Sequence, residues 1–331
     1  MNASLLSRAT AHLEMMRPYT VFYAGMLAIA GAEVASAGHV SGARVALAAL
    51  STMCGWEAGL YAGDYYDRKI DAISKPSRPV PSGRVSPREA FTTMVALIAV
   101  GYVFSLLLGP ANLALAILTT VLGIAYSKTF KGRALIGNFD RGILGGLAVA
   151  FGALAAGNLF SLALLILAGF AFFHDSGTNL VGAMRDLEGD RAAGCRTVPV
   201  VYGIRAGLSI ASGLAATAAV LAVLLFIGLQ ANWLAVVLLV VALLIEIYAH
   251  ARLWLERRDI GRRLALQAHK YLVFGRLVLM AAVIAIAAPR LAIPLVAASA
   301  ALTIGSQLLL RDRYERERIT PGAGADAPAR P

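Results

Sequence analysis

The feature that most constrains this chain is a series of long apolar runs separated by short polar turns. A helix needs about 20 mostly apolar residues to cross the hydrocarbon core of a bilayer. Mean hydropathy is +0.71, and 15% of residues are charged against about 25% in a typical soluble domain. The sequence predicts an all-α, polytopic membrane protein with nine to ten transmembrane helices. We expect them near residues 19–37, 43–62, 90–109, 111–127, 138–156, 159–181, 206–228, 232–251, 272–288 and 291–310.

The positive charge of the chain follows this pattern of runs. The formal net charge is +11. If the N-terminus lies in the cytoplasm, only Arg44 and Arg290 of the 30 Lys and Arg residues lie on the outer side of the membrane. Basic residues are retained on the cytoplasmic side of membrane proteins. The charge therefore indicates topology rather than a nucleic-acid partner. We expect a multi-pass protein of the plasma (inner) membrane, and the basic C-terminal end favours ten spans. The sequence gives no indication of oligomeric state.

Two acidic motifs close apolar runs. In residues 63–71, Asp67 and Asp71 are four apart and share a helical face, and Asp64 lies close by. The second motif occupies residues 186–191. Converging carboxylates repel one another unless a cation lies between them, and Mg²⁺ prefers hard oxygen ligands that it often shares with substrate phosphates. The predicted Mg²⁺ ligands are Asp64, Asp67, Asp71, Asp186 and Asp190.

The repetition of the motif predicts an internal duplication. Each motif closes the second helix of a four-helix unit and precedes a basic, proline-containing segment. We expect two pseudo-symmetric four-helix repeats around a central cavity, at residues 19–135 and 136–270, with one or two extra helices at 271–310. Residues 1–18 are a predicted cytoplasmic segment and 311–331 a basic, largely disordered tail. Small residues favour close helix packing in the fifth run, namely Gly142, Gly145, Gly146, Gly152 and Gly157.

The two motifs resemble those of the UbiA superfamily of intramembrane prenyltransferases. The resemblance rests on Asp-Tyr-Tyr-Asp-Arg-Lys-Ile-Asp, Arg-Pro-Val-Pro-Ser-Gly and Asp-Leu-Glu-Gly-Asp-Arg, and covers roughly residues 12–290. The family's first motif usually opens with Asn, where this chain has Gly63, so one potential metal-holding carbonyl is missing. The resemblance implies that diphosphate is bound by Arg17, Arg78 and Lys128, with Arg68 and Arg191 as further candidates. Each could instead be a positive anchor at a helix end.

The resemblance also implies a reaction. We expect Mg²⁺-dependent transfer of a prenyl group from an allylic prenyl diphosphate to an aromatic or other lipophilic acceptor inside the membrane. The diphosphate would ionise to a carbocation in a cavity that excludes water. Besides membrane lipids, the expected partners are the donor and the acceptor. The expected catalytic residues are Asp67, Asp71, Asp186 and Asp190. The alternative for these acids is a surface salt-bridge network.

Polar residues continue from both motifs into the apolar runs. Glu57 lies two helical turns before Asp64, and Asp175 and Asn179 continue the stripe below Asp186. Ionisable groups inside membrane helices are functional candidates. The acceptor or cavity candidates are Glu57, His174, Asp175, Asn179 and Tyr126. They could equally pair within the bundle, and Tyr126 could belong to an interfacial aromatic belt.

Two other functions fit parts of the pattern. A UbiA-type terpene cyclase would ionise the same donor but close the cation on its own chain. A transporter would also have repeats and intramembrane acids, but these would lie near the bilayer midplane. Here the paired acids end the runs, which favours the enzyme. Among prenyltransferases, the first acidic motif and the basic segment after it resemble the chlorophyll-synthase and geranylgeranylglyceryl-phosphate branches more than the haem branch.

Overall fold

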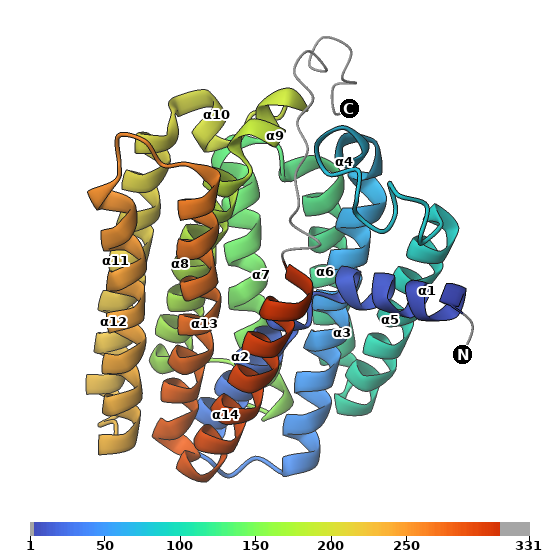
Figure 1. Cartoon of the computed structure of the whole chain (residues 1–331). Coiled ribbons are helices and arrows are strands. Elements are labelled where there is room, and N and C mark those ends of the chain that lie inside the picture. Colours follow the sequence, from blue (N-terminus) through green and yellow to red (C-terminus); the bar gives the residue numbers. More distant parts are fainter. Residues whose placement is uncertain (1–2, 312–331) are drawn as a thin grey trace.

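The computed structural model describes residues 3–311, and these residues form a helical bundle without strands (Figure 1). The predicted tail lies outside the described residues except for Arg311. The helices are α1 (Ala3–Met16), α2 (Pro18–Ser36), α3 (Gly42–Tyr66), α4 (Arg68–Ser74), α5 (Pro87–Leu108), α6 (Pro110–Ala125), η1 (Tyr126–Phe130), α7 (Ala134–Ala155), α8 (Leu162–Arg185), α9 (Leu187–Ala192), α10 (Val198–Tyr202), α11 (Ile204–Gly228), α12 (Trp233–Leu255), α13 (Arg262–Ala287), α14 (Pro289–Ser306) and η2 (Gln307–Arg311).

All ten predicted runs coincide with long helices. Among the described residues, nine helices are long and apolar enough to cross a membrane: α2, α5, α6 with η1, α7, α8, α11, α12, α13 and α14. α3 has 25 residues but is more polar, because it carries Glu57 and Asp64. It runs beside the others in the bundle (Figure 1). The prediction of nine to ten spans is therefore confirmed, whereas the division into two repeats stays a prediction.

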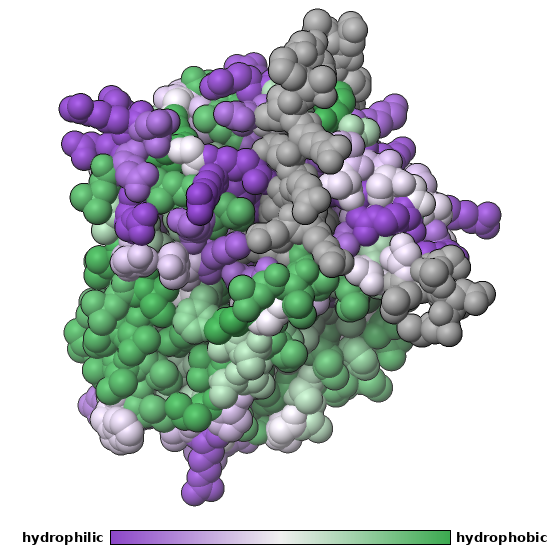
Figure 2. Space-filling view, viewed as in Figure 1, coloured by the Kyte–Doolittle hydropathy of each residue, from purple (hydrophilic) through white to green (hydrophobic). Residues whose placement is uncertain are grey.

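The surface separates into a polar end and an apolar belt. Figure 2 shows hydrophilic residues gathered at the end that carries α4, α9 and α10, with a broad hydrophobic zone below it. Exposed apolar side chains form this zone on the outer helices, including Leu107, Val121, Ile227 and Leu244. Such a belt suits contact with lipid tails rather than water. The most buried spans are α2, α8 and α13, which lie at the centre of the bundle.

The start of α13 differs from the prediction. The run was expected to begin at residue 272, but the helix begins at Arg262. The charges of its first turns hid this start, because they interrupt the apolar pattern that marks a span. A helix of 26 residues is about 39 Å long, which exceeds the ~30 Å hydrocarbon core. Its first turns therefore extend beyond the membrane.

Glycines allow α7 to approach its neighbours closely. A Cβ at Gly152 would lie 1.8 Å from the carbonyl oxygen of Ala28 on α2, and a Cβ at Gly31 would lie 2.1 Å from that of Val149. On the α8 side, a Cβ at Gly142 would meet Ser176 Oγ at 2.3 Å. These glycines confirm the expected close packing, because only a hydrogen fits at the contact. The predicted role was wrong for Gly157, which follows the end of α7 with a positive φ and touches nothing within 4 Å.

Arg44, one of the two basic residues expected outside, joins two helix ends. Its Nε donates to the carbonyl oxygen of Ala155 at 2.5 Å, and its Nη2 donates to that of Leu108 at 3.3 Å. These carbonyls close α7 and α5, where the last C=O groups of a helix lack intrahelical partners and the helix dipole favours a cation. Arg44 therefore departs from the retention of basic residues on the cytoplasmic side because it binds the carbonyl ends of α7 and α5.

The α2–α7 contact gives a stability prediction. We expect Gly152→Ala to lower the stability of the protein by about 1–3 kcal/mol, because its Cβ has to displace the backbone of Ala28. The control is Gly213→Ala on α11, where a Cβ has open space and should improve helix propensity. Thermal unfolding of both variants in detergent measures the difference. Equal melting temperatures would contradict the proposed contact.

Candidate active site

The two acidic motifs meet at the polar end of the bundle. α3 ends at Tyr66 and the chain bends at Asp67 before α4, while α8 ends at Arg185 and bends at Asp186 before α9. Both short helices lie at the same end (Figure 1). Lys75 Nζ donates to Asp186 Oδ1 at 3.0 Å, which joins the first motif region to the second across 111 residues of sequence.

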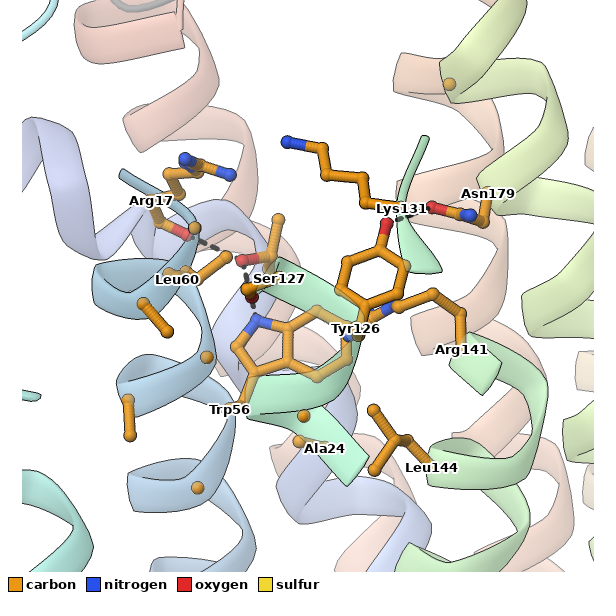
Figure 3. Close-up of a pocket in the computed structure, with 18 of the residues that line it drawn as sticks. Arg17, Ala24, Trp56, Leu60, Tyr126, Ser127, Lys131, Arg141, Leu144 and Asn179 are labelled. Carbon is orange, nitrogen blue, oxygen red and sulfur yellow. Dashed lines mark hydrogen bonds between the residues drawn. The ribbon is translucent and has the colours of Figure 1, made fainter. Parts of the chain in front are cut away.

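A cavity of about 340 Å³ begins between these motifs and continues into the bundle. Four acids line its mouth, namely Asp67, Asp71, Asp186 and Asp190, together with the basic residues Arg17, Lys75, Arg78, Lys131 and Arg185, while Asp175, Arg141 and Arg276 line the cavity further in. Apolar and aromatic side chains from α3, α5, α6 and α7 line the remainder, some of which are drawn in Figure 3. The cavity therefore has a charged mouth and a largely apolar body.

Ion pairs connect the acids of the mouth to basic side chains. Arg78 Nη1 donates to Asp71 Oδ2 at 2.7 Å, with both side chains 7% exposed. Lys131 Nζ donates to Asp67 Oδ2, and Arg185 Nη2 donates to Asp186 Oδ2 at 2.6 Å. Removing one partner of the buried pair Arg78–Asp71 leaves an uncompensated charge, at a cost of about 3–5 kcal/mol. The pairs therefore fix the shape of the mouth as well as its charge.

The two acids of the second motif have opposite tendencies to ionise. Burial disfavours the charge of Asp186, but Arg185 and Lys75 beside it hold the pKa of its carboxyl well below its usual range. Burial and the negative charge of Asp186 raise the pKa of Asp190 to about 7. Asp190 is therefore readily protonated near neutral pH, and a cation bound nearby would favour its ionised form.

The donor set of the mouth fits Mg²⁺ that is shared with a substrate. Its acids offer only carboxylate oxygens, the ligand type that Mg²⁺ prefers. Within residues 3–311, no three acidic, His or Cys side chains converge on one point as a ready-made cage. Mg²⁺ is usually held by one or two carboxylates plus water and substrate phosphates, so separate carboxylates around an open mouth are what such a site needs.

Asp64 has a different position from the other four acids. It is 3% exposed, does not appear among the cavity-lining residues, and accepts a hydrogen bond from Arg17 Nη2 at 2.7 Å. Arg17 lines the cavity and precedes α2 with a left-handed backbone, φ 46°. Asp64 therefore orients Arg17 at the mouth, and its role as a metal ligand stays a prediction.

The predicted basic residues separate into two groups. Arg17 and Arg78 line the cavity, whereas Lys128, Arg68 and Arg191 do not. Lys128 and Arg191 are exposed, and the guanidinium of Arg68 lies over the ring of Tyr65, 4.5 Å from its centroid. Lys131 was missed, although it lies only three residues beyond Lys128. Lys128 lies within the π-helical turn η1, whereas Lys131 directly follows this turn and is the lysine that reaches Asp67.

Some of the predicted acceptor residues line the cavity and others are buried elsewhere in the bundle. Tyr126, Asn179 and Asp175 line the cavity, and the Tyr126 hydroxyl donates to Asn179 Oδ1 at 3.3 Å (Figure 3). Glu57 and His174 are buried outside the lining, and His174 Nε2 lies 3.1 Å from Glu246 Oε1. This contact fits the alternative of pairing within the bundle. The proposed acceptor roles stay predictions.

Gly63, where the resemblance leads one to expect Asn, also lines the cavity. A Cβ added there would meet nothing within 4 Å, so packing does not require glycine at this position. Sequence reasoning also missed Lys75, Arg185, Trp56, Arg141 and Arg276 as lining residues. Lys75 lies four residues after Asp71 and Arg185 directly precedes Asp186, so nearness to the motifs was the available signal. The last three come from separate helices, and their spacing in the sequence carries no signal.

Comparison with known proteins identifies the family. Residues 24–271 match the UbiA prenyltransferase family. The chain belongs to this family. It is 37% identical over 238 residues to the digeranylgeranylglyceryl phosphate synthase of Natronomonas pharaonis, which covers 72% of this chain and 85% of that protein. The enzyme of the same name from Methanopyrus kandleri is 34% identical over 248 residues, with 74% and 90% covered. This member of the UbiA family is therefore a membrane prenyltransferase.

Solved structures agree with this UbiA fold. A structure of digeranylgeranylglyceryl phosphate synthase superposes with a TM-score of 0.64 at 27% identity, covering 85% of this chain and 98% of that one. A UbiA homologue from Archaeoglobus fulgidus, bound to GPP and Mg²⁺, gives a TM-score of 0.65 at 20% identity, with 88% and 99% covered. At that identity the second likeness establishes the fold alone.

The two neighbouring lysines provide a test of the site. We expect Lys131→Gln to lower kcat/KM for the prenyl diphosphate roughly 10- to 100-fold, because a charged hydrogen-bond donor at the mouth is lost. Lys128→Gln is the matched control, and we expect less than about a threefold change because its side chain is exposed away from the lining. Steady-state kinetics in detergent compares them. A larger loss of kcat/KM in Lys128→Gln than in Lys131→Gln would instead support the prediction from the sequence that Lys128 binds diphosphate.

Proposed function

We propose that the protein transfers a prenyl group from an allylic prenyl diphosphate to the hydroxyl of a prenylated glyceryl phosphate, with Mg²⁺ at the mouth of the cavity. The observation that carries this proposal is the meeting of two carboxylate motifs, joined through Lys75 and Asp186, above an apolar cavity. That arrangement suits a diphosphate headgroup above and an isoprenoid chain below.

The choice of acceptor rests on the relatives. Enzymes that are 37% and 34% identical bear the name digeranylgeranylglyceryl phosphate synthase, which denotes a glyceryl phosphate with two geranylgeranyl groups. We infer that this chain likewise uses geranylgeranyl diphosphate and a glyceryl phosphate that already carries one prenyl chain. The sequence allowed an aromatic or other lipophilic acceptor, and this proposal limits the acceptor to a prenylated glyceryl phosphate.

The residues of the mouth have distinct tasks in this reaction. Arg78, Lys75 and Lys131 are placed to donate charged hydrogen bonds to phosphate oxygens. Asp67, Asp71, Asp186 and Asp190 would hold Mg²⁺, which when bound neutralises charge on the leaving diphosphate. The apolar walls keep water from the electron-deficient carbon. A same-fold protein does bind GPP and Mg²⁺.

Prenyl transfer breaks one bond at C1 of the donor and forms another there. The C1–O bond of the donor breaks and the diphosphate leaves with the electron pair. The acceptor oxygen then bonds to C1 and gives up its proton, for which the departing diphosphate is the nearest base. Asp175 lies eleven residues before Asp186, about 16 Å deeper along α8, and is therefore far from this point.

We also infer the orientation of the protein. The polar end bears both motifs and most of the basic residues, and positive charge is retained on the cytoplasmic side. The mouth would therefore open to the cytoplasm from the plasma membrane, where water-soluble Mg²⁺ and diphosphate release are available.

The central test combines metal and acid variants. Purified protein is supplied with geranylgeranyl diphosphate, geranylgeranylglyceryl phosphate and Mg²⁺, while diphosphate release and product mass are followed. We expect Asp67→Asn and Asp186→Asn to lower kcat roughly 100-fold or more, because charge stabilisation of the leaving group is lost. EDTA should stop turnover and Mg²⁺ should restore it.

Asp259→Asn serves as the control, since Asp259 lies in the turn between α12 and α13 outside the cavity. We expect it to retain full activity. Turnover that persisted in EDTA would overturn the Mg²⁺ proposal. A cyclic hydrocarbon or alcohol formed without acceptor would instead identify a terpene cyclase.

A further inference from the structure

The cavity contains a second basic group of residues below its mouth. Arg141 on α7 and Arg276 on α13 both line it. Their guanidinium carbons lie 4.3 and 5.4 Å from the ring centroid of Trp56 on α3. Trp56 is itself fixed, because its Nε1 donates to Thr20 Oγ1 at 3.0 Å (Figure 3). Three helices thus contribute one arginine–tryptophan cluster, which we call the inner basic cluster.

Arg141 differs from the basic residues of the mouth. Arg17, Lys75, Arg78, Lys131 and Arg185 each contact a carboxylate. Arg141 instead lies over the rings of Trp56 and Tyr126, and within residues 3–311 it has no hydrogen bond or ion pair. Its chain neighbour Asp140 interacts with it electrostatically, but neither Asp140 nor the cavity-lining Asp175 forms an ion pair with it. A cation inside a membrane protein is costly when no anion contacts it, so this position points to an anionic ligand.

The depth of the inner basic cluster separates it from the diphosphate site. Trp56 precedes Asp67 by eleven residues, which is about 16 Å along α3. Asn179, which bonds Tyr126 beside Arg141, precedes Asp186 by seven residues, or about 10 Å along α8. A single diphosphate at the aspartates does not extend that far. A second anion, brought by the other substrate, is needed to reach the cluster.

We propose that Arg141 and Arg276 bind the phosphate monoester of the acceptor lipid and so select a phosphorylated acceptor. This proposal rests on the proposed function. Guanidinium groups bind phosphate with two parallel N–H···O bonds. The cation–π contact with Trp56 holds the guanidinium of Arg141 in place without using its N–H donors on a carboxylate. With its phosphate held there, the acceptor presents its glycerol hydroxyl upward, toward the reacting carbon of the donor.

Arg141 and Arg276 would also bind a carboxylate, so the acceptor class has to be tested directly. Three acceptors are compared with geranylgeranyl diphosphate and Mg²⁺ present: geranylgeranylglyceryl phosphate, its dephosphorylated glycerol ether, and a hydroxybenzoate. For the wild-type protein we expect kcat/KM to be at least about tenfold higher with the phosphate than with the glycerol ether, because a charged hydrogen-bonded pair is formed.

The decisive variant is Arg141→Gln. We expect kcat/KM for the phosphorylated acceptor to fall roughly 10- to 100-fold through a raised KM, while kcat/KM for the dephosphorylated ether changes less than about threefold. KM for the donor should stay unchanged, which also shows that the variant is folded. Arg141→Lys should recover part of the preference because the charge returns without the planar fork. Arg205→Gln, an exposed arginine on α11, is the matched control and should behave as wild type.

The outcomes separate this proposal from the proposed function. If the wild-type protein uses the phosphorylated acceptor and Arg141→Gln keeps the full preference for phosphate, the inner basic cluster does not bind it, although the function stands. A similar loss with both glycerol acceptors would show that Arg141 only supports the fold. A wild-type protein that turned over only the hydroxybenzoate would overturn both. If Arg141→Gln is too unstable to purify, Arg141→Lys with the same pair of glycerol acceptors decides the question.

Discussion

The requirement that buried carboxylates be balanced by cations governs the architecture of this protein. Two helices end in aspartates at the same face of the bundle, and charges in such positions are unfavourable unless opposite charges lie within reach. The ion pair between Lys75 and Asp186 provides an opposite charge across the two motifs. Arg78 and Lys131 provide it within the mouth, where they pair with Asp71 and Asp67. The same interactions thus set both the shape of the fold at its polar end and the chemistry available there.

The sequence predicted the membrane fold well because its signal is local. Each apolar run is long, and its composition alone separates it from the turns. The acidic motifs were equally visible, since their members lie within one or two helical turns. The start of α13 was missed for the converse reason: Arg262 and Arg263 break the apolar pattern although the helix continues through them.

The cations of the site were harder to predict. Lys131 and Lys128 look equivalent in the sequence, and only the local geometry of η1 distinguishes the residue that reaches Asp67. Arg141 and Arg276 lie in the expected runs 138–156 and 272–288, and neither belongs to a motif that marks a site. Their association with Trp56 depends on how α3, α7 and α13 pack, which one sequence does not reveal.

The contact between α2 and α7 has a consequence for how substrate range can change. Because the two backbones touch at Gly31 and Gly152, no side chain larger than a hydrogen fits between α2 and α7 at these positions. α5 and α6, which contribute the lining residues Ile98, Tyr102 and Thr120, are by contrast the least buried of the apolar spans that line the cavity. Space for bulkier or longer isoprenoids is therefore gained more easily by substitutions on α5 and α6 than at the contact between α2 and α7.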